Sequence, residues 1–389
     1  MESLTQDGTS VETAPPGVAP SKKRIAIAAA VLGCFAVFGL DGLLFHTNLY
    51  PSILDPDSTA GLFELILRRE LKVQSQEGQN VVLTLGNSRL AYSRKLLDRS
   101  GLDKPYHLRT AGIAGSNART WYYMLRDLDP TRRRYRAIVL AVDDYDDEDN
   151  GGDPADDIHD LHYLIARLRW ADVFSFAGSF DDPLLRRQVL RGTILKGIVL
   201  QDDIRAFLAR PIHRFQYVEL CNREYSNWDY DYLETTRSMA GLAIDWTTLQ
   251  VTFPPDADDN QKDTVKAFLV HKPNAQTGRL ATFRLTWFGR IIDAYRGSDT
   301  KIVFLHLPRG PIPRPDGLSV KLTSSIRELA TRPNVLLSGE HAFDSLEHPE
   351  LFKDGMHLNR EGINRFSVLL EQEVRRVLRG PDNKMAVAR

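Results

Sequence analysis

The sequence predicts an α/β fold of three layers: a doubly wound, parallel five-stranded sheet with helices on both faces. A large helical insertion and an N-terminal transmembrane helix are expected in addition. Short apolar segments alternate with amphipathic helical ones, as in parallel strands joined by crossover helices. The apolar segments, such as AIVLAVD at residues 137–143, lack polar alternation, which is typical of strands covered on both sides. The length of 389 residues suits one such domain with an insertion.

The strand-like and helix-like segments follow one another in a regular order. We expect the five strands at residues 81–86, 106–112, 137–143, 301–308 and 334–339. We expect helices of the same domain at residues 88–100, 117–128, 319–331 and 360–378. The order strand, helix, strand is what a parallel sheet requires, because each strand must return to the same end of the sheet.

The alternation is lost between residues 145 and 298, and we interpret this stretch as an insertion into the domain. Helical patterns are expected at residues 158–170, 183–198, 204–209 and 278–295, around an irregular centre at 211–258. An insertion that follows a strand of such a sheet overhangs the crevice where ligands bind.

The N-terminus predicts a membrane anchor. Residues 1–23 are rich in small and polar residues and end in a basic cluster, so we expect a disordered cytoplasmic tail. Residues 24–45 are predominantly apolar and about as long as a bilayer requires. A cleaved signal peptide and a buried core helix are the alternatives for this segment. A retained anchor predicts a single-pass protein of the cell membrane whose remaining chain faces the periplasm or exterior.

The rest of the chain is divided by composition. We expect a linker at residues 46–80, the α/β domain at 81–380 and a flexible tail at 381–389. A net charge of −1 gives no support for a nucleic-acid partner. Cys34 and Cys221 form no disulfide framework, and we predict no cofactor and no metal. The acidic run at 143–157 has the composition of a cation site, but its spacing differs from that of an EF-hand loop, and a solvated acidic loop is the simpler interpretation.

Two distant stretches carry the candidate chemistry. VVLTLGNSRLAYS at 81–93 is typical of a buried strand that turns directly into a helix at Ser88. FKDGMHLNREGINRFS at 352–367 places Asp354 and His357 three residues apart before the last helix. The carboxyl ends of parallel strands meet at one edge, so the fold can bring these side chains together. A serine, a histidine and an aspartate in this order suit acyl transfer by a nucleophilic hydroxyl. The alternative is that Ser88 only caps a helix and that His357 is structural.

Together these stretches resemble the SGNH/GDSL esterase superfamily, whose first motif supplies the serine and whose last, D-x-x-H, supplies the other triad members. The resemblance implies Ser88, Asp354 and His357 as the catalytic triad. It also implies an oxyanion hole in which the Ser88 N–H is one donor. The stretch TAGIAGSNAR at 110–119 is similar to the second block of the family. This block makes the Gly115 N–H the second donor, with the Asn117 side chain as a further one.

Two blocks depart from the family pattern. The third block usually reads G-x-N-D, whereas this chain has Ala141-Val142-Asp143-Asp144, and an ionised Asp cannot donate to an oxyanion. The first block has Asn87 where Asp is usual. These departures look like those of membrane-anchored members that work beside membrane-bound O-acyltransferases in modifying cell-surface polysaccharides. That resemblance implies an esterase or O-acyltransferase acting on acylated carbohydrate.

Several further residues have two interpretations. Arg89 and Arg309 follow strands at the same edge, where they could bind an anionic substrate group or only support the structure. His306 is more typical of a packed strand residue than of a catalytic one. The aromatic residues at 121–123 could stack on a sugar or lie in the core. A catalytically silent module that binds polysaccharide or scaffolds a membrane acyltransferase is the alternative function, motivated by the missing third-block Asn.

Overall fold

The computed structural model describes most of the chain, and the description below concerns that part. The described residues are 22–47, 49–74, 80–91, 106–147, 154–224, 236–270, 278–315 and 323–379. The chain forms two compact units, residues 1–48 and 49–389. The predicted disordered tail lies outside the described residues except for Lys22 and Lys23, and the predicted tail at 381–389 lies wholly outside them.

The first unit contains the helix α1, Lys22–Phe45, which is long and apolar enough to cross a membrane. Its 24 residues would span about 36 Å, compared with a hydrocarbon core of about 30 Å. Its most apolar stretch is fully unburied, which argues against the interpretation as a core helix of a soluble protein. Side chains such as Leu32 and Phe35 are exposed in it.

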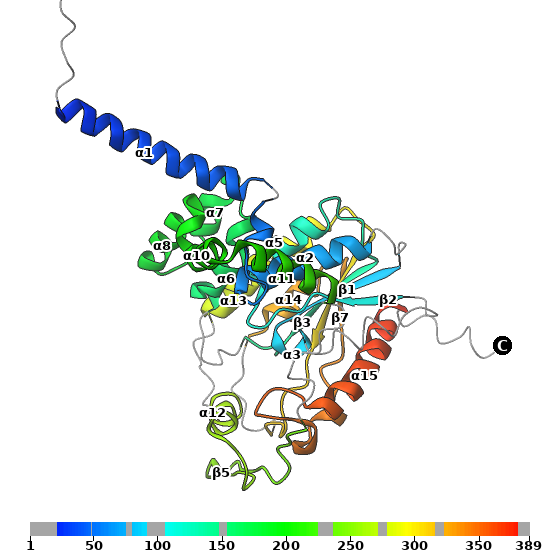
Figure 1. Ribbon diagram of the computed structural model, residues 1–389. Helices are drawn as coiled ribbons and strands as arrows, with labels where there is room; N and C mark the ends of the chain where they lie inside the picture. The colour runs from blue at the N-terminus through cyan, green and yellow to red at the C-terminus, as the bar shows by residue number, and fades with distance from the viewer. Residues whose placement is uncertain are drawn as a thin grey trace, which may run out of the picture. The chain divides into compact units, whose positions relative to one another are not determined.

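The second unit is built on a sheet of five parallel strands in the order β2-β1-β3-β6-β7 (Figure 1). Its strands are β1 Val81–Leu85, β2 His107–Thr110, β3 Ala137–Val142, β6 Lys301–His306 and β7 Val335–Leu337. Every residue of β1 and β3 is buried, because helices cover the sheet on both sides. The predicted five-stranded parallel sheet is therefore confirmed, and each strand falls within its predicted range.

Helices pack on both faces of this sheet. On one face lie α5 Ala118–Leu128, α13 Gly278–Ala294 and α14 Ser325–Leu329, where Phe288 of α13 meets Phe304 of β6 with the two ring centroids 5.1 Å apart. On the other face α15, Arg360–Arg379, and α3, Ser88–Ala91, join a core with the alternate side chains of the strands. Residues 92–100 of the predicted first helix lie outside the described part.

The strand order creates a switch point beside β1. The chain leaves β1 toward β2 on one side, and then crosses back to place β3 on the other side. In doubly wound sheets the loops that follow the two strands at such a reversal diverge and leave a crevice for ligands. The loops in question begin at Gly86, after β1, and at Asp143, after β3.

Most of the segment predicted as a linker, residues 46–80, belongs to the second unit. Residues from Leu49 onward belong to the compact second unit, with the 3₁₀ helix η1 at Tyr50–Ser52 and α2 at Thr59–Gln74. Phe63, Leu65 and Leu67 of α2 are buried. A helix that buries several large apolar side chains is part of the folded core of the second unit.

The stretch between β3 and β6 is mostly helical, as predicted, but its parts differ in role. It contains α6 His159–Leu164, α7 Val173–Ala177, α8 Pro183–Ile194, α9 Lys196–Val199, α10 Gln201–Ala209, α11 Pro211–Glu224 and α12 Asp259–Phe268, together with short 3₁₀ helices at 154–156, 165–167 and 170–172. Three features correct the prediction. The centre expected to be irregular contains α11 and the hairpin β4 Ala243–Asp245 with β5 Gln250–Thr252. The helix α13, expected in the insertion, is the crossover helix of the sheet and buries Trp287 and Phe288.

Candidate active site

The structure brings together the three residues that the sequence singled out for acyl-transfer chemistry. Ser88 Oγ lies 2.9 Å from His357 Nε2, although the two residues are 269 positions apart in the chain. His357 Nδ1 lies 2.9 Å from Asp354 Oδ2 and 3.2 Å from Asp354 Oδ1. Both ring nitrogens are therefore within hydrogen-bonding distance of an oxygen, and the three side chains form one continuous relay.

Ser88 is positioned by a tight turn between β1 and α3. Gly86, the first residue after the strand, is buried, and a Cβ there would lie 2.7 Å from Leu90 Cβ and 3.2 Å from Ala141 Cβ. The Gly86 carbonyl accepts hydrogen bonds from the Ile113 N–H and the Ser116 hydroxyl. Glycine thus allows the close turn, and the loop after β2 is fixed against it.

Asn87 links this turn to the loop after β3. Its Oδ1 accepts from the Arg89 N–H at 3.0 Å, and its Nδ2 donates to Asp143 Oδ2 at 2.9 Å. Arg89 Nη1 also donates to Asp143, and its other terminal nitrogen donates to the Pro308 carbonyl. The two departures from the family pattern, Asn87 and Asp143, therefore form one hydrogen-bonded pair. This contact could not be predicted from the sequence, because nothing in either segment indicates that Asn87 and Asp143 meet.

The Asp354 and His357 side chains project from a short closed loop. A bridge between Phe352 and Leu358 closes the loop, and the Lys353 N–H donates to the His357 carbonyl. Asp354 Oδ1 accepts from the backbone N–H groups of Met356 and His357, at 2.9 and 2.8 Å. The aspartate is therefore held by its own loop before it contacts the imidazole.

A helix of the insertion braces this loop from outside. Two residues of α12, Gln261 and Thr264, form hydrogen bonds with the loop. The Gly355 N–H donates to Thr264 Oγ1 at 2.9 Å, and Gln261 Nε2 donates to the Lys353 carbonyl at 2.5 Å. A Cβ on Gly355 would lie 2.6 Å from the carbonyl carbon of Thr264 and from the Val265 nitrogen. Sequence reasoning missed these bracing residues, and only the glycine of the DGMH stretch gives a signal for the close approach.

The electrostatics of the loop favour an ionised Asp354. Burial by itself would raise the pKa of this carboxyl. The hydrogen bond and charge of His357, together with the N–H groups of Met356 and His357, outweigh burial and hold the pKa below its usual value. An ionised carboxylate beside Nδ1 favours the tautomer that carries its proton on Nδ1, and this leaves Nε2 free to accept the Ser88 proton.

The residues expected to form an oxyanion hole lie in different settings. Within the part of the chain that the structure describes, the N–H groups of Ser88 and Gly115 donate to no protein acceptor. Gly115 has φ +70°, a left-handed conformation in which a side chain would be strained. Asn117 is the N-cap of α5, and its Nδ2 donates to the buried Asp160 at 3.1 Å. Its amide is thus engaged in supporting the helix.

The two arginines singled out at this edge are both ion-paired. Arg89 pairs with Asp143 at 2.9 Å, and Arg309 pairs with Glu347 at 2.9 Å and with Asp344 at 2.8 Å. These pairs fit the supporting interpretation, and a role in binding substrate stays a prediction.

His306 and the aromatic cluster are packed. Burial lowers the pKa of His306, its Nδ1 lies 2.6 Å from the Leu307 carbonyl, and the Tyr145 ring packs edge-on against it. Trp121 and Tyr123 are buried against aromatic residues of α13 and α7. These contacts fit the interpretation of both as core features.

The acidic run after β3 is engaged where it is described. Asp147 is buried and accepts from Arg284 and from Ser325. Among the described residues no group of three or more acidic, histidine or cysteine side chains is arranged to hold a metal ion. Residues 148–153 of the run lie outside the described part.

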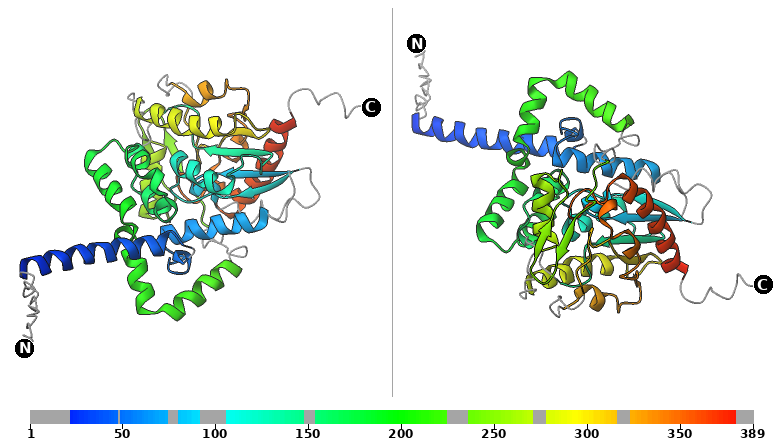
Figure 2. Two further views of the ribbon diagram at one scale, coloured as in Figure 1. Left: turned by 90° about the horizontal axis from the view of Figure 1, so that it is seen from above. Right: turned by 90° about the horizontal axis from the view of Figure 1, so that it is seen from below.

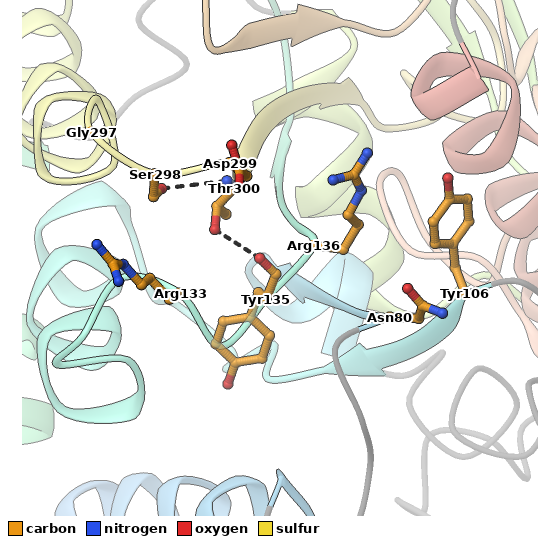
Figure 3. Close-up of a pocket in the computed structure, with 9 residues that line it drawn as sticks. All are labelled: Asn80, Tyr106, Arg133, Tyr135, Arg136, Gly297, Ser298, Asp299 and Thr300. Atoms are coloured by element: carbon orange, nitrogen blue, oxygen red, sulfur yellow. Dashed lines mark hydrogen bonds between the residues drawn. The ribbon is translucent and has the colours of Figure 1, made fainter.

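A cavity of about 780 Å³ lies at the opposite edge of the sheet (Figure 3). Asn80, Tyr106, Arg136 and Thr300 line it, and each stands just before a strand. Ser88, in contrast, follows its strand. The cavity and the triad are therefore separate features.

A comparison with protein-family models finds none that matches this chain, and a comparison with curated protein sequences finds no match either. The functional argument therefore depends on the geometry of the residues themselves.

Proposed function

We propose that this protein is a serine esterase or O-acyltransferase whose triad is Ser88, His357 and Asp354. The observation that carries the proposal is the continuous relay from Ser88 Oγ through both imidazole nitrogens to the Asp354 carboxylate. A serine hydroxyl is a weak nucleophile and requires such a base within hydrogen-bonding distance. The position of the relay at the switch point of a doubly wound sheet supports the proposal further.

In the first half-reaction Ser88 Oγ attacks the carbonyl carbon of an ester, and its proton passes to His357 Nε2. The bond between the carbonyl carbon and the leaving oxygen then breaks, and His357 returns the proton to that oxygen. Asp354 remains ionised and stabilises the imidazolium that exists between these steps. The product is an acyl group bound to Ser88 through an ester.

In the second half-reaction water or a sugar hydroxyl attacks the acyl-serine, and His357 takes its proton and returns one to Ser88 Oγ. Both half-reactions pass through an oxyanion. The N–H groups of Ser88 and Gly115 are the donors that we assign to it, because neither has a competing acceptor among the described residues. Each such donor lowers the activation free energy by on the order of 3 kcal/mol.

The substrate class follows from the resemblance and from α1. We infer an acylated carbohydrate at the cell surface, with the SGNH type of α/β fold and with α1 as a single-pass anchor that leaves the catalytic unit outside the cytoplasm. A membrane-bound O-acyltransferase is the partner that the resemblance implies. The basic cluster at the start of α1, Lys22 to Arg24, supports this orientation.

The test is turnover of an aryl acetate together with labelling by a serine-directed fluorophosphonate. Ser88→Ala should abolish labelling and lower turnover by roughly 1,000-fold or more. Ser298→Ala is the matched control, because Ser298 lies at the opposite edge of the sheet. Labelling that persists in Ser88→Ala would remove the nucleophile assignment, whereas a wild type with neither labelling nor turnover would favour a silent, polysaccharide-binding module. The distance of 2.9 Å between Ser88 and His357 is our reason to rank the enzyme first.

A further inference from the structure

Exposed apolar side chains of the second unit are concentrated in one run of helices. Eleven large apolar side chains outside α1 are exposed in the described chain, and eight of them lie between Trp170 and Leu220. We call α7 to α11, Val173–Glu224, the outer helices. Consecutive helices of this run contact one another. Figures 1 and 2 show α7, α8 and α10 outside the layers of the sheet, whereas α11 lies beside α2.

The side chains concerned are large and well exposed. The most prominent are Phe174, Leu184, Ile198, Leu208, Ile212 and Phe215. Phe174 is 80% exposed and Ile212 is 72% exposed, whereas the apolar residues of the helices on the sheet are mostly buried. Single exposed apolar residues are common on proteins, but a concentration of them indicates an interaction surface.

The outer helices carry a small excess of basic residues. Between Val173 and Glu224 there are eight Lys or Arg residues and six Asp or Glu residues, in a chain whose net charge is −1. Arg187, Arg191 and Arg210 are exposed between the apolar side chains. A mixture of bulky apolar side chains and arginines is typical of helices that lie in the interface of a bilayer with anionic lipids.

The connection between α1 and the second unit is short. Only residues 46–49 separate α1 from η1, a reach of roughly 17 Å for an extended chain. The segment after η1 is bonded directly to the outer helices: Arg214 of α11 pairs with Asp55 at 2.5 Å, and the Tyr217 hydroxyl donates to Asp57 at 2.9 Å. Leu49, which precedes η1, is itself 58% exposed.

From these observations we propose that the outer helices form a second membrane contact, which rests on the surface of an anionic bilayer. The proposal uses α1 as an anchor and does not depend on the chemistry at Ser88. A short connection to a membrane-spanning helix limits how far the bonded segment and its partner helix α11 can lie from the bilayer surface. A protein groove would explain the apolar side chains, but the bilayer also explains the small excess of basic residues and the short connection.

The experiment separates the contact from the anchor. A protease site is inserted between Thr47 and Leu49 in the full chain, which is reconstituted into vesicles and then cut. The vesicles are phosphatidylcholine alone or phosphatidylcholine mixed with phosphatidylglycerol. After cutting, the second unit should remain on the mixed vesicles and leave the phosphatidylcholine vesicles. The triple variant Leu208→Asp, Ile212→Asp and Phe215→Asp should reduce the bound fraction on mixed vesicles by about tenfold.

Val368→Asp is the control, because Val368 is an exposed apolar residue of α15, outside the outer helices. Circular dichroism checks that each variant is folded. As a second readout, a fluorophore at Leu208→Cys should be quenched by nitroxide lipids in the uncut chain, and one at Val368→Cys should not. Equal release of wild type from both kinds of vesicle, or binding that requires another protein, would overturn the proposal. An uncut chain that fails to float with vesicles would instead contradict the anchor.

Discussion

Two histidine–aspartate pairs in this protein have the same spacing and nearly the same geometry, yet only one belongs to a relay. His357 Nδ1 lies 2.9 Å from Asp354, and His341 Nδ1 lies 2.9 Å from Asp344, each at a separation of three residues. The His357 side chain is 14% exposed and that of His341 is 69% exposed. His357 Nε2 meets a serine hydroxyl, whereas His341 has only its aspartate among the contacts that the structure describes.

Because these two pairs share their spacing and distance, a histidine–aspartate pair alone is weak evidence for catalysis. What distinguishes the pair at 354–357 is burial of the carboxylate, its two backbone N–H donors and a nucleophile on the far side of the ring. These features hold the imidazole in one tautomer and orient its Nε2 toward the Ser88 hydroxyl. The predictions below test whether these features separate the two pairs.

The largest expected difference is between His357→Ala and His341→Ala. Removal of His357 deprives Ser88 of its base, so we expect turnover of an aryl acetate to fall by roughly 1,000-fold or more. His341→Ala removes only an exposed pair and should change turnover by less than about twofold. Similar losses in both variants would show that the relay has no special role.

The aspartates should differ almost as much. Asp354→Asn is expected to lower turnover by about 100-fold to 10,000-fold, because the neutral amide no longer selects the reactive tautomer. Asp344→Asn should have little effect. Initial rates at saturating substrate measure both, and an Asp354→Asn enzyme with near-normal turnover would remove the aspartate from the mechanism.

The effect of Asp354→Asn on stability should depend on pH. The pKa of Asp354 is lowered in the folded protein, so its interactions stabilise the fold above the ordinary carboxyl pKa of 3.8 and are lost as the pH falls through the lowered value. The difference in Tm between wild type and Asp354→Asn should therefore shrink as the pH is lowered below 3.8. A difference that grows in acid would contradict the lowered pKa.

A smaller effect is expected where α12 braces the catalytic loop. Gly355→Ala places a Cβ against the backbone of Thr264 and Val265, so the loop must shift. A displacement of about 1 Å at the imidazole costs on the order of 100-fold in turnover. Gly339→Ala is the control, because a Cβ there meets nothing within 4 Å. Unchanged turnover in Gly355→Ala would mean that α12 does not set the geometry.

The smallest effect on turnover is expected for the pair Asn87 and Asp143. A double-mutant cycle measures how strongly the two residues are coupled. Asn87→Asp alone places a second carboxylate beside Asp143, so we expect about a tenfold loss of turnover. Adding Asp143→Asn restores one donor and one acceptor to the pair and should recover most of that loss. If the two changes simply add, the hydrogen bond between these residues does not position Ser88.

Much of this molecule was predictable because its signals are local. Buried strands such as VVLTL are apolar throughout, and α5 and α15 bury apolar residues at helical spacing, so their types follow from the sequence. Ser88, Asp354 and His357 could be selected because each stands in a short stretch with its own pattern, next to a strand end or before a helix.

Tertiary structure decided what depends on contacts between distant segments. The Asn87–Asp143 pair joins residues 56 positions apart, and the brace from Thr264 to Gly355 joins residues 91 apart. No pattern within either segment specifies such a contact. The predicted linker became part of the domain because the body of the protein buries the apolar side of α2. The sequence by itself determined which segments are strands of the five-stranded sheet and which residues are chemically suited to the site. Only packing determined their distances, because distance and burial are properties of pairs of segments and not of any one of them.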